Sequence, residues 1–169
     1  MLKKFSSGLY FTLLLCLVTG CGFHLRGVFN IPDALKVIHI VPNQPYDPFQ
    51  RALRQTLKTN AVQLVDAELA KASGAATLTI LGHTISERTI AYGADGQPNR
   101  SLLTLTINYQ LTDKNGKILV ENGVAEIQRE LAVNPNVVLG TDNERTRLKS
   151  EMILEGASQV VRQLSLVTL

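Results

Sequence analysis

Apolar and polar residues alternate strictly from residue 103 to residue 112. The odd positions are apolar, and the even positions are threonine, asparagine or glutamine. Period two predicts a β-strand with one buried face and one face open to water or to a polar partner. The turn dipeptide Asn115-Gly116 follows, so a second strand from Ile118 to Leu131 is expected to fold back antiparallel. Arg129 falls among the apolar positions of this second strand, which indicates a place near an edge of the sheet.

Three segments upstream also have the pattern of strands. Residues 36–41 are rich in β-branched side chains, and residues 62–65 predict a short edge strand. Residues 77–91 predict a long strand whose alternation changes phase at Gly82, where a β-bulge fits. The small and polar residues 66–74 favour a loop or a loose helical turn.

Two segments have the period of amphipathic helices. Phe49, Leu53 and Leu57 recur every four residues behind Asp47-Pro48, a pair that suits a helix cap and a first helical position, and Asn60 is a plausible stop. The second helix lies near the C-terminus, where the spacing of Thr141 and Glu144 is that of a capping box. Its apolar stripe consists of Leu148, Met152, Ile153, Ala157, Val160, Val161 and Leu164.

The order of these elements predicts the fold class. A strand, a helix, several antiparallel strands and a final helix indicate an α+β fold, with two helices packed on one face of a mostly antiparallel sheet of about four strands. This arrangement buries both apolar stripes. We expect one domain over residues 36–169, preceded by an irregular segment at 21–35.

The first twenty residues have the layout of a lipoprotein signal peptide. Lys3 and Lys4 precede the apolar stretch Leu9 to Val18, which is too short to cross about 30 Å of hydrocarbon as a helix. Residues 18–21, Val-Thr-Gly-Cys, resemble the lipobox of bacterial lipoproteins. That resemblance implies cleavage before Cys21, a diacylglycerol on its sulfur and acylation of the new amine. An ordinary signal peptide with an incidental cysteine is the alternative.

Composition and charge narrow the class of partner. The chain has 169 residues, of which 45% are hydrophobic, enough to bury the core of one domain. Its 17 basic and 14 acidic residues give a charge of +3, but removal of Lys3 and Lys4 with the signal peptide leaves 15 against 14, or +1. Aromatic residues make up 5% and tryptophan is absent, which argues against a surface that stacks nucleobases. We therefore expect no nucleic-acid partner.

The motifs that catalysis requires are missing from the sequence. His24, His39 and His83 are far apart, and none has the spacing of a zinc motif. There is no nucleophile elbow, P-loop or dinucleotide fingerprint, and Cys21 would carry lipid rather than act as a nucleophile. We predict that the protein is not an enzyme and has no metal site. A lipid-anchored hydrolase is the disfavoured alternative.

Exposed surfaces that could bind a partner, rather than a catalytic site, therefore remain as the candidates for function. The polar face of the central strand either is solvated or meets a polar partner, and residues 92–100, 113–117 and 132–141 are the natural binding loops. Five arginines are candidates for contacts with anionic groups, although scattered surface arginines are the commoner explanation. They are Arg88, Arg100, Arg129, Arg145 and Arg147.

One family shares several of these motifs. The run Cys-Gly-Phe-His-Leu-Arg-Gly at 21–27, directly after a lipobox, resembles the start of the LPS-assembly lipoproteins of the LptE family. The resemblance covers essentially the whole chain. Its later parts are Ile31-Pro32, the strand segment 35–40, residues 51–54 of the first helix, Asn134-Pro135 and residues 142–144.

The resemblance implies a non-catalytic role in the outer membrane. Proteins of this kind plug the lumen of the β-barrel LptD, one to one, assist its assembly, bind lipopolysaccharide (LPS) and help insert it into the outer leaflet. It also implies a lipid anchor on Cys21, a periplasmic location inside the partner barrel, no cofactor, and LPS contacts by arginines such as the five above. Gly22, at the position after the cysteine, favours the outer membrane. The alternative is a periplasm-facing lipoprotein scaffold of another envelope assembly machine.

Overall fold

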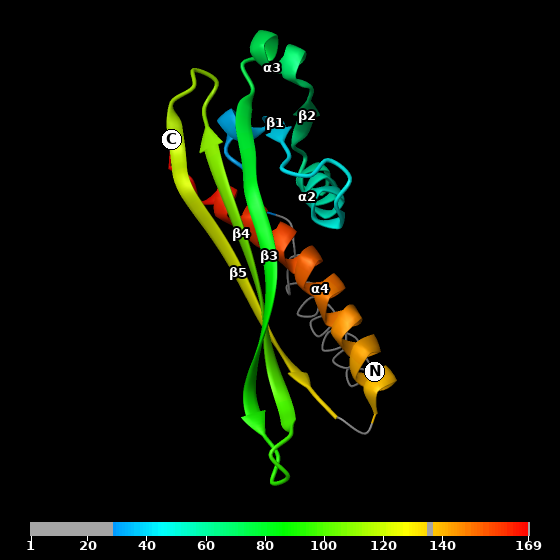
Figure 1. The fold of residues 1–169 in the computed structure, drawn as a ribbon. Helices are drawn as coiled ribbons and strands as arrows, with labels where there is room; N and C mark the ends of the chain where they lie inside the picture. Colours follow the sequence, from blue (N-terminus) through cyan, green and yellow to red (C-terminus); the bar gives the residue numbers. More distant parts are fainter. Residues whose placement is uncertain (1–28, 135–136, 169) are drawn as a thin grey trace, which may run out of the picture.

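The computed structural model describes residues 29–134 and 137–168 (Figure 1). The predicted signal peptide and Cys21 lie outside the described residues. The elements, in chain order, are the 3-10 helix η1 (Asp33–Leu35), β1 (Val37–Val41), α2 (Pro48–Thr59), β2 (Gln63–Val65), α3 (Ala67–Ser73), β3 (Ala76–Tyr92), β4 (Pro98–Thr112), β5 (Ile118–Ala132) and α4 (Val138–Ser165).

The strands form one mixed sheet in the order β2-β1-β3-β4-β5. The expected sheet of about four mostly antiparallel strands is corrected to five strands, because β1 pairs in parallel with both β2 and β3. The physical reason is connectivity: α2 carries the chain back along the sheet between β1 and β2, so the second strand runs in the same direction as the first. Only β3, β4 and β5 pair antiparallel, as the hairpin signals predicted.

The α+β class and the placement of the two main helices are confirmed. The strands β3, β4 and β5 form a long twisted ribbon, and α4 runs along one face of it with α2 packed beside it (Figure 1). The short helix α3 lies at one end of the sheet, where the sequence suggested only a loop or a loose turn. The opposite face of the ribbon has no helix on it among the described residues.

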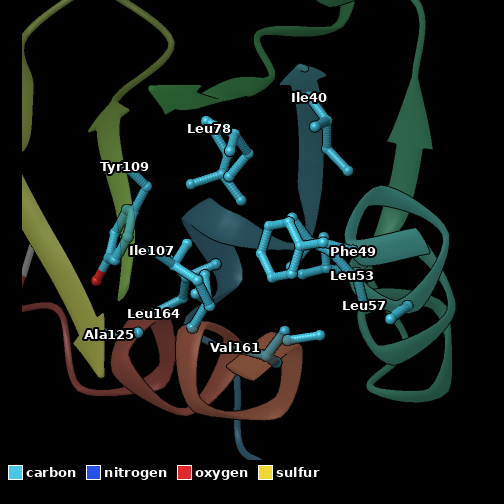
Figure 2. Close-up of a cluster of buried hydrophobic side chains, with 14 of the residues drawn as sticks. Ile40, Phe49, Leu53, Leu57, Leu78, Ile107, Tyr109, Ala125, Val161 and Leu164 are labelled. Carbon is cyan, nitrogen blue, oxygen red and sulfur yellow. The ribbon is translucent and has the colours of Figure 1, made fainter. Parts of the chain in front are cut away.

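The core lies between that sheet and the two helices. Every odd position of β4 from Leu103 to Leu111 is buried, and so are Phe49, Leu53 and Leu57 of α2 (Figure 2). The predicted stripe of α4 is buried as well, apart from Ile153, which is partly buried. One contact was not foreseen: Gly156 lets α4 approach the sheet closely, since a Cβ there would fall 2.6 Å from Cδ1 of Ile107.

Local details confirm some capping predictions and correct others. Asn60 ends α2 and the β-bulge at Gly82 is present. Asp47 stands at the helix cap, but its side chain makes no cap hydrogen bond and its Oδ2 lies 3.5 Å from Nε2 of His83 instead. The predicted capping box of α4 is wrong because the helix begins earlier, at Val138. The Thr141 hydroxyl therefore lies inside the first turn and donates to the Val137 carbonyl.

The side chain of Tyr109 links the sheet to α4. Its ring covers Gly123 of β5, where a Cβ would overlap the ring atoms, so the position requires glycine. The phenol hydroxyl donates a hydrogen bond of 2.9 Å to Oε1 of Gln163 in α4. Burial disfavours the charged phenolate and raises the pKa of Tyr109 above its ordinary value of 10.0.

We expect this shift to make the fold sensitive to strong alkali. Because the folded-state pKa of Tyr109 exceeds the unfolded one, its contribution to stability is complete below pH 10 and is lost as the pH rises through the folded-state pKa. Urea denaturation of the Tyr109→Phe variant should show a shallower fall in stability above pH 10 than the original chain. Identical slopes for the two proteins would contradict this account.

Candidate functional site

The uncovered face of the β3–β5 ribbon consists mainly of hydroxyl and amide side chains. In register across the strands, Thr84 pairs with Thr106 and Ser86 pairs with Thr104, which in turn pairs with Gln128. These positions are exposed or half-buried. We call this surface the open face. It is made of Thr77, Thr79, Thr84, Ser86, Thr104, Thr106, Asn108, Gln110, Thr112, Val124, Glu126 and Gln128.

The open face is polar but carries little charge. Glu126 is the single ionisable residue in the set, and its Oε1 accepts a hydrogen bond of 2.6 Å from Nε2 of Gln128. The face therefore presents hydrogen-bond donors and acceptors to its surroundings without a cationic field. This confirms the sequence prediction of one buried and one polar face for β4, and shows that the polar face continues onto β3 and β5.

Four of the five predicted arginines are engaged by carboxylates. Nη1 of Arg100 lies 3.4 Å from Oε2 of Glu130, and Arg129 pairs with Glu155 of α4. The position of Arg129 on β5, the edge strand, also agrees with the sequence prediction.

The two predicted arginines that lie on α4, Arg145 and Arg147, each contact two carboxylates. Nε of Arg145 lies 2.9 Å from Oε2 of Glu87 in β3, and the hydrogen bonds to Glu87 raise the pKa of Arg145. Arg147 pairs with Glu144 and Glu151 on its own helix. Hydrogen bonding to Glu144 raises the pKa of Arg147, and the same contact lowers the pKa of Glu144. The helical spacing of this second set was visible in the sequence. The pairing of Arg145 with Glu87 joins residues that are 58 positions apart, which no local pattern reveals.

Arg88 differs from the other four candidates. It is exposed, and within residues 29–134 and 137–168 it has no carboxylate partner. It stands opposite Leu102 of β4, in the row of the ladder that continues the open face beyond Ser86 and Thr104. The structure thus leaves one of the five arginines with its charge available to an anion.

The predicted binding loops gather at opposite ends of the sheet. The β3–β4 turn and residues 132–134 together line a hollow of about 610 Å³, and the backbone N–H of Val133 donates to the carbonyl of Asn99. The β4–β5 turn lies at the other end, beside η1 and the end of α3, where it lines a hollow of about 450 Å³. Neither set of lining residues includes an arginine, and the first includes no lysine.

His39 and His83 make packing and backbone contacts, and His24 lies outside the described residues. Nδ1 of His39 lies 3.0 Å from the Val65 carbonyl, and the His83 ring packs at a centroid distance of 5.2 Å from Phe49. In the described part of the chain, no three histidine, cysteine or acidic side chains come together as a metal site would require. No helix among these residues has the length and apolar character needed to cross a membrane.

Comparison with known proteins decides the family. The family described as LptE, lipopolysaccharide-assembly, matches residues 35–164, which is most of the chain. The chain belongs to the LptE family. This confirms the resemblance seen in the sequence, and with it the expectation of an LPS-assembly lipoprotein.

Individual LptE proteins agree with this assignment, and a solved structure agrees with the fold. The LPS-assembly lipoprotein LptE of Photorhabdus laumondii is 31% identical over 145 residues, covering 86% of this chain and 77% of that one. The LptE of Yersinia pestis strain Pestoides F is 32% identical, with coverages of 86% and 68%. The crystal structure of the rare lipoprotein B from Shewanella oneidensis matches with a TM-score of 0.67 at 19% identity. It covers 76% of this chain and 93% of that one, and it supports the fold alone.

Proposed function

We propose that this chain is a non-catalytic outer-membrane lipoprotein that plugs the LptD β-barrel and assists its assembly. In this role it binds LPS and helps to insert it into the outer leaflet. The observation that carries the proposal is the open face. The interiors of outer-membrane barrels are polar, and hydroxyl and amide side chains can form hydrogen bonds with such a wall. Membership of the LptE family supports the same role.

Recognition of LPS needs a local positive charge, because the predicted mature chain carries a formal charge of only +1. Guanidinium groups bind phosphates through paired hydrogen bonds. Arg88 has its charge available, whereas Arg100, Arg129, Arg145 and Arg147 already contact carboxylates. We propose that Arg88 makes the main contact with LPS phosphates. The other four arginines would bind LPS only if its phosphates displaced their carboxylate partners.

The proposed lipid on Cys21 fits this function physically. An anchored domain stays beside the membrane in which the barrel folds, which raises its effective concentration there. No cofactor is required by this role.

Substitution of Arg88 tests the assignment. A charge-assisted hydrogen bond contributes about 1.5–3 kcal/mol, so Arg88→Gln should weaken binding to purified LPS by roughly 10- to 100-fold. The matched control is Arg147→Gln, which removes an arginine already paired with Glu144 and Glu151 and should change the affinity little. Titration of immobilised LPS measures both. Loss of affinity in the control with none in Arg88→Gln would overturn the assignment.

Depletion of the protein tests the proposed function in cells. We expect surface LPS to fall and permeability to hydrophobic antibiotics to rise as the protein is depleted. Normal LPS export in depleted cells would contradict the proposal and favour a scaffold in another envelope machine.

A further inference from the structure

The exposed side of α2 carries a stripe of positive charge. Arg51, Arg54 and Lys58 fall within one arc of the helix, on the side opposite Leu53 and Leu57. All three are exposed, and the helix contains no acidic residue. We call these three residues the α2 stripe.

The charges of the α2 stripe are not neutralised within the described residues. Arg51 donates a hydrogen bond of 3.0 Å to the Tyr46 carbonyl, a neutral acceptor, and none of the three residues forms an ion pair there. Asp47, the acid that precedes the helix, points inward to His83. Arg100, Arg129, Arg145 and Arg147 contrast with this, since carboxylates engage them.

The chain enters the domain beside this helix. The backbone N–H of Phe29 donates to Oδ1 of Asn60, the residue that ends α2, at 2.5 Å. Phe29 is the eighth residue after Cys21, so the proposed lipid attachment site lies at most about 29 Å from this point. The α2 stripe begins nine residues before Asn60, about 14 Å along a helix. A lipid on Cys21 therefore holds α2 close to the membrane surface.

We infer that, in the anchored domain before it enters the barrel, the α2 stripe lies against the phosphate headgroups of anionic phospholipids in the membrane that carries the anchor. The charge is complementary, the helix presents its basic side outward, and the entry point of the chain places that side near the bilayer. Each basic residue beside an anionic surface favours contact by about fivefold, so three residues shift the orientation of the domain by roughly a hundredfold. The inference rests on the lipid anchor in the proposed function and adds the face that the domain turns to the membrane.

The test uses the full lipidated chain with a spin label at Gln55→Cys, an exposed position within the stripe. Lipid on the sulfur of Cys21 leaves the introduced thiol as the one that reacts. The protein is inserted into vesicles of phosphatidylcholine alone, or of phosphatidylcholine with phosphatidylglycerol, each with a nickel-chelating lipid. We expect collisions between the label and nickel to be several-fold more frequent in the anionic vesicles, and high salt to abolish the difference.

Two triple variants separate the stripe from a general effect of charge. Arg51→Gln with Arg54→Gln and Lys58→Gln should lose the difference between the two vesicle types. The control is Lys71→Gln with Lys114→Gln and Lys117→Gln, which removes the same charge from exposed residues elsewhere and should retain the difference. Thermal unfolding checks that each variant folds. The effect of salt on the original sequence tests the inference even if a variant does not fold.

The possible results distinguish a failure of this inference from a failure of the proposed function on which it rests. A chain that fails to float even with neutral vesicles has no anchor, which contradicts the proposed lipid on Cys21. An anchored chain whose label meets nickel equally often in both vesicle types overturns the inference alone. A label that gains contact only when LPS is added assigns the stripe to LPS phosphates, and this also overturns it.

Discussion

Replacing Phe49 by alanine should lower the free energy of unfolding by about 3–5 kcal/mol, a large part of the stability of a domain of this size. The Phe49 side chain is fully buried where α2 meets the sheet and α4, and its ring also packs against His83 of β3 (Figure 2). Its loss removes apolar burial and leaves a cavity that the surrounding strands cannot fill. Urea denaturation followed by circular dichroism measures the change.

Two neighbouring changes serve as controls for this result. Phe49→Leu keeps part of the volume and should cost less than Phe49→Ala. Tyr46→Ala removes an aromatic ring that is 91% exposed and should shift the stability by no more than about 0.5 kcal/mol. Equal losses in Phe49→Ala and Tyr46→Ala would show that the packing of α2 is not what holds this part of the fold together.

Replacing Cys21 by alanine should abolish attachment of lipid to the protein and, with it, anchoring of the protein in the outer membrane. Each buried methylene of a lipid contributes about 0.8 kcal/mol, so several acyl chains together provide an anchor that no surface contact of this domain replaces. The variant should also keep residues 1–20, because cleavage of a lipoprotein signal follows lipidation. Fractionation of cells and mass analysis of the N-terminus measure the two effects.

A conservative change checks that the sulfur is responsible for the anchor. Gly22→Ala alters the next residue without touching the thiol, and it should leave the lipid in place. A Cys21→Ala protein that has lost residues 1–20 and remains in the outer membrane at the level of the original protein would refute the anchor and point to the ordinary signal peptide that the sequence left as the alternative.

The parts of the fold that could be predicted from the sequence are those with local causes. Alternation at 103–112 predicted the buried and open faces of β4, and Asn115-Gly116 predicted the turn to β5, where Gly116 adopts a φ of 81°. The recurrence of Phe49, Leu53 and Leu57 predicted the buried side of α2. Each signal spans a few residues and depends little on the rest of the chain.

The parts that could not be predicted depend on residues far apart. Nothing in residues 36–41 indicates that β1 pairs in parallel with β3, because that register arises only when α2 and α3 have folded between them. Likewise, the sequence spacing allows Arg145 to pair with Asp142 on its own helix, but it does not reveal the contact with Glu87 of β3. Sequence reasoning therefore named five arginines for LPS without separating Arg88, whose distinction is the lack of a carboxylate partner among the described residues.

The α2 stripe shows a second limit on what the sequence alone can predict. The sequence identified this helix only by the recurrence of its apolar positions, not by the charges on its exposed side. Their significance depends on the contact of Phe29 with Asn60, which fixes where the chain enters, and on the engagement of the arginines elsewhere by acids. Both observations require the three-dimensional structure.

If this LptE-family chain plugs a partner barrel, the barrel should accompany the native protein through purification. The chain is extracted from outer membranes in mild detergent through an affinity tag at its C-terminus, and the stoichiometry of the proteins that accompany it is measured. The account predicts one large outer-membrane β-barrel, LptD, at a ratio of one to one. Recovery of the chain without such a barrel would contradict it.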